Sequence, residues 1–317
     1  MSRRTGGGPP ETVEASELDA DSITNNGFYN RCFTNGFCIF YLVVCILNIL
    51  VGVPGNGLVI WITGLKMKKT VNTTWYLSLA VSDFIFCATF PSSYLIAIGV
   101  ATFGFFMTNF TFALIFISLF SSIFLLVIVC VDHCVSVVFP VWAQNNRTID
   151  KASVVVILVW VSSVALSTHY MFAGEIDIPK ILLSQLIGGF AVPFLIIIFC
   201  YSVIILRLRT RRMMSVSSKS LKVMTDMIAL FFICWLPFYT FLLFPLGNIY
   251  SSPMFKGIII MVGVTLATVH SILRPVLYVC MGNNVPPTLK RSIVGRIENV
   301  LGEEDPPTTS HETSTHL

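Results

Sequence analysis

Seven long apolar stretches constrain the fold of this chain more than any other feature. A helix needs about 20 mostly apolar residues to cross the hydrocarbon core of a bilayer. The stretches cover residues 38–63, 73–99, 104–137, 152–172, 178–206, 220–245 and 257–281. Strands of a membrane barrel would alternate polar and apolar residues, and these stretches do not. We therefore predict an all-α fold, a bundle of seven transmembrane helices.

The composition excludes several other classes of protein. Only 11% of the residues are charged, whereas soluble domains carry about 25%. The net charge of +4 is modest, and its basic residues are explained by membrane topology rather than by a nucleic-acid surface. The sequence contains no Gly-rich phosphate loop, no metal-ligand spacing of His and Cys, and no convincing Ser/His/Asp set. We expect no enzyme, no cofactor and no nucleic-acid partner.

The basic residues predict the orientation of the chain, because cytoplasmic loops are enriched in Lys and Arg. Of the 20 Lys and Arg residues, 14 fall in one set of loops and the C-terminal tail, and five fall on the other side. We therefore predict a multi-pass protein of the plasma membrane with an extracellular N-terminus and a cytoplasmic C-terminus. An odd number of spans agrees with this orientation.

The pattern of composition and hydrophobicity divides the chain into four predicted segments. Residues 1–36 are Gly-, Pro- and acid-rich and predict a disordered extracellular N-terminus. Residues 37–282 form the seven-helix domain, residues 283–301 an amphipathic helix on the inner surface, and residues 302–317 a disordered cytoplasmic tail. The amphipathic helix is expected to set apolar residues such as Ile293 and Ile297 against the inner leaflet; a frayed tail is the alternative, because two prolines delay the helix.

Landmarks inside the spans point to a family. They are Gly55-Asn56-Gly57, Leu79–Asp83, Asp132-His133-Cys134, Trp160, Pro193, Tyr201, Cys234-Trp235-Leu236-Pro237 and Pro275–Tyr278. In this order and spacing they resemble a rhodopsin-like (class A) G-protein-coupled receptor. Residues 66–72 and 139–148 are also similar to the chemoattractant branch, which holds formyl-peptide, chemerin and prostaglandin D2 receptors. The resemblance covers about residues 37–300.

The resemblance implies a receptor that signals through outward movement of the sixth span. Its implied partners are a heterotrimeric G protein of the inhibitory type, arrestin and membrane lipid. The residues that match the family's activation switch lie in five of the spans. They are Asp83, Ser118, Ser122, Tyr201, Phe231, Trp235, Pro237, Arg274 and Tyr278.

The seventh span departs from the family at Arg274, where the family has asparagine before proline. In the family, an acid at the position of Asp83 helps to bind sodium. A lone acid inside an apolar span is costly unless it is paired, and Arg274 is expected at the same depth as Asp83. We predict a buried Asp83–Arg274 ion pair that replaces the sodium ion, so no metal is expected. Snorkelling of Arg274 to the inner phosphates is the alternative.

A second departure is Asp132-His133-Cys134, where the family has Asp-Arg-Tyr. The resemblance makes these three residues the G-protein contact. Histidine is shorter than arginine and cannot offer a bidentate fork. His133 is therefore either a damaged coupling contact or a cap on Asp132, with coupling through the loops.

The outer half of the bundle also departs from the family. Thr108 stands where the family has a disulfide cysteine, the loop at 173–177 has no cysteine, and Cys32 and Cys38 either pair or stay free. The implied ligand pocket contains no charged residue, so we expect an apolar ligand or none. Its residues are Ile115, Phe116, Leu119, Gln185, Phe238, Tyr239, Leu242, Val264 and Thr268.

The leading hypothesis is an atypical chemoattractant-like receptor, and constitutive activity is one expectation because the sodium brake and an ionic lock are absent. A decoy or scavenger receptor, or a viral copy that modulates host signalling, is the alternative. A seven-span transporter or channel fits less well, since no inverted repeat or pair of broken helices is present.

Overall fold

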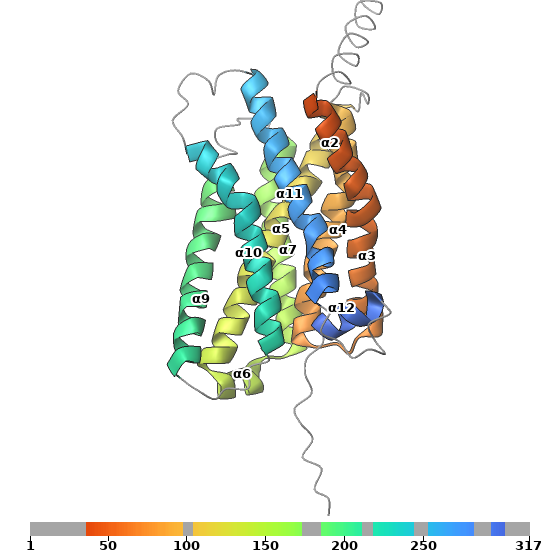
Figure 1. Cartoon of the computed structure of the whole chain (residues 1–317). Coiled ribbons are helices and arrows are strands. Elements are labelled where there is room, and N and C mark those ends of the chain that lie inside the picture. The colour runs from red at the N-terminus through yellow and green to blue at the C-terminus, as the bar shows by residue number, and fades with distance from the viewer. Residues whose placement is uncertain are drawn as a thin grey trace, which may run out of the picture.

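The computed structural model describes residues 36–97, 104–172, 185–210, 218–243, 253–281 and 293–301. Its long helical segments run side by side in one bundle, with α6 and α12 at the same end (Figure 1). The elements are α2 (Gly36–Leu47), η1 (Asn48–Gly52), α3 (Val53–Trp61), η2 (Ile62–Lys66), α4 (Val71–Ala97), α5 (Phe105–Val138), α6 (Pro140–Asn146), α7 (Ile149–Phe172), η3 (Gln185–Ala191), α9 (Val192–Thr210), α10 (Ser218–Leu243), α11 (Pro253–Met281) and α12 (Ile293–Leu301).

These elements form seven long segments that match the predicted spans, with α2 to η2 as the first and η3 with α9 as the fifth. By length and composition, four described segments are apolar enough to cross a membrane: Ile39–Lys66, Phe106–Val138, Ile149–Thr168 and Leu186–Arg207. The other three, α4, α10 and α11, pack into the same bundle. α5 lies at its centre, against α4, α7 and α9, and α10 packs on α11.

Two spans contain a π-helical turn next to a proline. η1 precedes α3, which begins with Val53-Pro54, and η3 runs directly into α9, which begins with Val192-Pro193. Proline lacks a backbone N–H and its ring crowds the carbonyl four residues earlier. A wider turn relieves that crowding while the helix continues, so the first and fifth spans stay helical across their prolines.

Gly52 allows the first span to approach α4 and α11 closely. A Cβ atom on Gly52 would lie 2.7 Å from Asn48 Oδ1, 2.9 Å from Cys87 Sγ and 3.1 Å from Ile272. The close approach lets Asn48 donate a 2.7 Å hydrogen bond to the Cys87 carbonyl on α4. The first, second and seventh spans are thus joined at the level where the polar site lies.

Two features of the inner end differ from expectation. The short helix α6 follows α5 and was not predicted, because seven residues are too few to show a helical period. In α12, Ile297, Val300 and Leu301 are buried against the bundle, where α12 contacts α11, η2 and α10. The expectation that this apolar face lies on the lipid is therefore wrong for these three residues, although Ile293 is 54% exposed.

Candidate functional site

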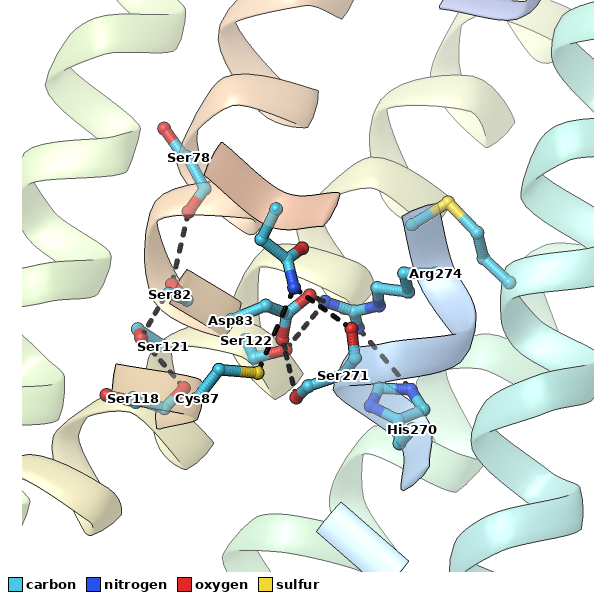
Figure 2. Close-up of polar contacts among 12 residues, drawn as sticks. Ser78, Ser82, Asp83, Cys87, Ser118, Ser121, Ser122, His270, Ser271 and Arg274 are labelled. Carbon is cyan, nitrogen blue, oxygen red and sulfur yellow. Dashed lines mark hydrogen bonds and ion pairs between the residues drawn. The ribbon is translucent and has the colours of Figure 1, made fainter. Parts of the chain in front are cut away.

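Asp83 and Arg274 form an ion pair in the middle of the bundle. Arg274 Nη1 lies 2.7 Å from Asp83 Oδ2, and each residue is 1% exposed. The predicted contact is therefore present, and Arg274 does not snorkel to the membrane surface. Figure 2 shows the two side chains facing each other between α4 and α11.

Three neighbouring side chains complete the polar site. Arg274 Nη1 also donates to Ser122 Oγ over 2.8 Å, and the Ser271 hydroxyl donates to Asp83 Oδ1 over 3.0 Å. His270 Nε2 lies 3.5 Å from Arg274 Nη2. Both charges thus lie among polar groups that α5 and α11 provide, which lowers the cost of burying them.

Helical spacing explains why these residues meet. On α11, His270 lies four and Ser271 three positions before Arg274, so the three side chains share one face of the helix. Ser118 and Ser122 are also four apart on α5. Only Ser122 reaches Asp83, at 3.4 Å from Oδ1, whereas the Ser118 hydroxyl donates to the Leu114 carbonyl of its own helix.

Asn56 fastens the first span to this site. Its side-chain amide donates to the Gly52 carbonyl over 2.9 Å and to the Ser271 carbonyl over 3.1 Å. On the other side, Ser82 and Ser121 share a 2.9 Å hydrogen bond between α4 and α5. The ion pair therefore lies within a network that joins the first, second, third and seventh spans (Figure 2).

Little empty space is left beside the ion pair. A cavity of about 10 Å³ remains, with Asp83, Ser118, Ser122, Trp235 and His270 among its lining residues. A water molecule needs about 10–15 Å³ of such volume, so this cavity has room for about one water molecule. Arg274 Nη1 lies directly against Asp83 Oδ2.

The aromatic residues of α10 pack between the fifth and seventh spans. The Phe231 ring lies 6.4 Å from the Phe190 ring of η3 and 6.2 Å from the His270 ring. Trp235, which is 2% exposed, lines the cavity beside the ion pair. Phe231 therefore packs on the fifth span. Pro237 lies within α10, but its side chain is outside the described residues.

Two tyrosines tie the inner ends of α9 and α11 to α10. The Tyr201 hydroxyl shares a 2.8 Å hydrogen bond with Thr225, and the Tyr278 hydroxyl donates to Met227 Sδ over 3.7 Å. Both hydroxyls therefore contact α10. The arrangement holds the sixth span against its neighbours.

The predicted G-protein contact lies near the C-terminal end of α5, at the end of the bundle that carries α6. Asp132 accepts hydrogen bonds from Arg147 and from Trp75 Nε1. His133 is 7% exposed and its Nδ1 lies 2.9 Å from the Val129 carbonyl of the same helix. Cys134 is 8% exposed. The three residues are therefore mostly covered.

The predicted ligand pocket is described only in part. Ile115 and Thr268 are buried, and Phe116 and Leu119 are half-buried. Gln185, Phe238, Tyr239, Leu242 and Val264 lie on described helices, but their side chains are outside the described residues. Cys32, the side chain of Cys38, and the loop at 173–177 are likewise outside them.

The order of the spans and the polar site at their centre agree with one family. A family model described as "7 transmembrane receptor (rhodopsin family)" matches residues 55–278. The chain belongs to this family. Formyl peptide receptor-related sequence 6 of Mus musculus is 33% identical, covering 89% of this chain and 94% of the relative. N-formyl peptide receptor 2 of Homo sapiens is 34% identical, covering 85% of this chain and 87% of the relative.

These matches confirm the predicted seven-transmembrane fold and the chemoattractant branch of class A receptors. The protein is a G-protein-coupled, chemoattractant-like receptor of the plasma membrane that couples to heterotrimeric G proteins, and it is not an enzyme. The name of the human relative describes a receptor for N-formyl peptides, and the mouse relative is named as a sequence related to formyl peptide receptors.

Several residues of these polar networks lie outside the predicted site, among them His270, Ser271 and Arg147. The spacing of four positions between His270 and Arg274 is a signal that could have found His270. Ser271 shares that face and was not considered. Arg147 was counted only for orientation, because nothing local in the sequence connects it with Asp132, 15 positions earlier.

Proposed function

We propose that this receptor signals to G proteins of the inhibitory type with substantial basal activity and without control by sodium. The observation that carries the proposal is the Asp83–Arg274 ion pair of 2.7 Å. The Arg274 guanidinium holds Asp83 in place of a sodium ion, so added sodium cannot bind there and shift the receptor toward its inactive state. A receptor of this kind lacks one ligand that favours the inactive state.

The orientation that this function requires follows from charge. Described basic residues gather at the end of the bundle that carries α6 and α12 (Figure 1). They are Lys66, Lys68, Lys69, Arg147, Lys151, Arg207, Lys222 and Arg296. Cytoplasmic loops are enriched in Lys and Arg, so we assign this end, with the G-protein and arrestin contacts, to the cytoplasm.

The experiment measures nucleotide exchange on purified inhibitory-type heterotrimers with no added ligand. We expect exchange above that of empty nanodiscs, with equal rates in NaCl and in N-methylglucamine chloride of the same ionic strength. Arg274→Asn, which introduces the family's residue before Pro275, is the matched variant. Its exchange is expected to fall when NaCl is supplied, since Asp83 can then take up sodium. A wild-type rate that falls in NaCl contradicts the proposal.

The alternative is a decoy receptor with weak coupling. The observation that favours it is His133, which bonds to its own helix instead of standing free at the inner surface. Absence of nucleotide exchange, together with arrestin recruitment and internalisation, would support this second function over the first.

The ligand is proposed to be apolar, or absent. None of the nine predicted pocket residues is charged, and the described ones offer only Thr268 as a polar side chain. A charged ligand end would lose its hydration without gaining a partner. An uncharged apolar compound is therefore the class to screen first.

An anionic membrane lipid is the proposed lipid partner. An apolar groove of about 690 Å³ lies between α5 and α7, with Phe124, Val155 and Leu158 among its lining residues. Lys151 is exposed and lies one helical turn before Val155, on the same face of α7. An acyl chain in the groove would bring its headgroup near this lysine.

Lys151→Gln is therefore expected to weaken binding of phosphatidylserine about fivefold relative to phosphatidylcholine, since one lysine near anionic lipid contributes ~1 kcal/mol. Native mass spectrometry of receptor with titrated lipid measures this preference. Lys222→Gln, at another exposed lysine, is the control and is expected to change the preference much less. Equal effects of the two variants would argue against a site on α7.

A further inference from the structure

Asp132 is neutralised by an arginine that belongs to a different element. Arg147 Nε lies 3.0 Å from both carboxylate oxygens of Asp132, and Arg147 Nη2 lies 2.8 Å from Oδ2. The two side chains are only 15% and 24% exposed. A guanidinium that binds both carboxylate oxygens forms a strong and directional ion pair. Because both side chains are partly buried, dissolved salt screens this ion pair less.

Arg147 connects three helices. It directly follows α6, where its backbone N–H donates to the Ala143 carbonyl over 2.9 Å. Its guanidinium also donates to the Asn72 side chain in the first turn of α4. Trp75, one turn further on α4, donates to Asp132 Oδ2 over 3.3 Å. The end of α6 is therefore held against both α4 and α5.

The residue after Asp132 is a histidine. His133 directs Nδ1 to the Val129 carbonyl one turn earlier, and an imidazole cannot offer the bidentate fork that Arg147 presents to Asp132. The partner of Asp132 is thus located after α6, in a separate element from the acid. α6 therefore cannot move away from α5 unless the Asp132–Arg147 ion pair separates.

The orientation of α6 matters because its surface is apolar and uncovered. Phe139, directly before α6, is 59% exposed, and Val141 and Trp142 are 71% and 57% exposed. Large exposed apolar side chains that gather on one short segment favour contact with a partner. Their direction depends on how α6 is fastened to the bundle.

We propose that Arg147 is the positioning residue for α6. By holding Asp132 and Asn72, it fixes the direction in which Phe139, Val141 and Trp142 face a cytosolic protein, and release of Asp132 frees α6. The part that concerns the G protein rests on the proposed function. The anchoring of α6 does not.

The first test measures amide hydrogen exchange of full-length receptor in nanodiscs. Arg147→Gln is expected to speed exchange of residues 140–147 about tenfold, with α5 and α7 unchanged. Lys222→Gln, at an exposed lysine of α10, is the control and is expected to leave 140–147 within twofold of the wild type. Similar exchange in the wild type and Arg147→Gln overturns the proposal, as does acceleration by both variants.

Arg147→Lys is a control for global unfolding, because lysine keeps the positive charge but cannot bind both carboxylate oxygens as the guanidinium does. An intermediate acceleration confined to 140–147 supports the proposal. Acceleration spread over all helices in both Arg147 variants overturns it, because Arg147 would then be a general stabilising residue.

The second test separates positioning from folding. The G-protein concentration for half-maximal nucleotide exchange is expected to rise about tenfold in Arg147→Gln, with an unchanged maximal rate. A fall in the maximal rate alone would indicate lost receptor rather than a displaced α6, and would overturn the positioning role. If wild-type receptor gives no exchange at all, the proposed function fails, while the hydrogen-exchange test still decides the anchoring of α6.

Discussion

Arg274→Met is expected to destabilise the receptor by about 3–5 kcal/mol, because removal of one partner leaves a buried charge without compensation. Asp83 is 1% exposed, so water cannot replace the lost guanidinium. Thermal unfolding in nanodiscs measures the effect, and the amount of receptor at the cell surface should fall with it.

Two further variants make this prediction specific. Asp83→Asn together with Arg274→Met removes both charges and is expected to recover much of the loss, because neutral groups avoid the cost of desolvating ions. Lys66→Met breaks a 3.1 Å ion pair with Glu298 whose side chains are 47% and 31% exposed. Exposed pairs contribute about 0–1 kcal/mol, so this control should be nearly neutral. Stability of Arg274→Met equal to that of the control would contradict the pair's structural role.

The central ion pair was predictable because the bilayer makes charge expensive. Two opposite charges at one depth in a bundle have few partners other than each other, and the sequence places Asp83 and Arg274 at corresponding depths of their spans. The residues around the ion pair were harder to predict from the sequence. Ser118 and Ser122 share one face of α5, and their different heights along the helix decide that Ser122 meets the pair.

The inner end of the bundle was less predictable, because its contacts join segments far apart in sequence. Arg147 and Asn72 are 75 positions apart, and both lie at the ends of helices where hydrophobic periodicity gives no information. α6 is seven residues long, below the length at which a helical period can be detected. For α12, periodicity predicted an apolar face, but which part of that face meets the bundle depends on how the chain turns after α11.

His133→Arg is expected to raise the rate of ligand-independent nucleotide exchange about tenfold, the factor given by ~1.4 kcal/mol of added interaction with the G protein. The substitution introduces the longer, always charged side chain that the family has at this position. In most arrangements the neighbouring acid would hold that arginine back. Here Asp132 is already bound to Arg147 at 2.8 Å, so the new guanidinium is left to reach the cytosolic partner.

The initial rate of GTPγS binding to purified heterotrimers measures the gain. His133→Gln, which changes the ring without adding charge, is the control and is expected to leave the rate within twofold of the wild type. A rate that stays constant or falls in His133→Arg would mean that Asp132 or the buried environment retains the new side chain. The combination with Arg147→Gln separates these causes. Asp132 then lacks its partner and is expected to capture the introduced arginine, so at saturating G protein the combined variant should exchange nucleotide no faster than Arg147→Gln alone.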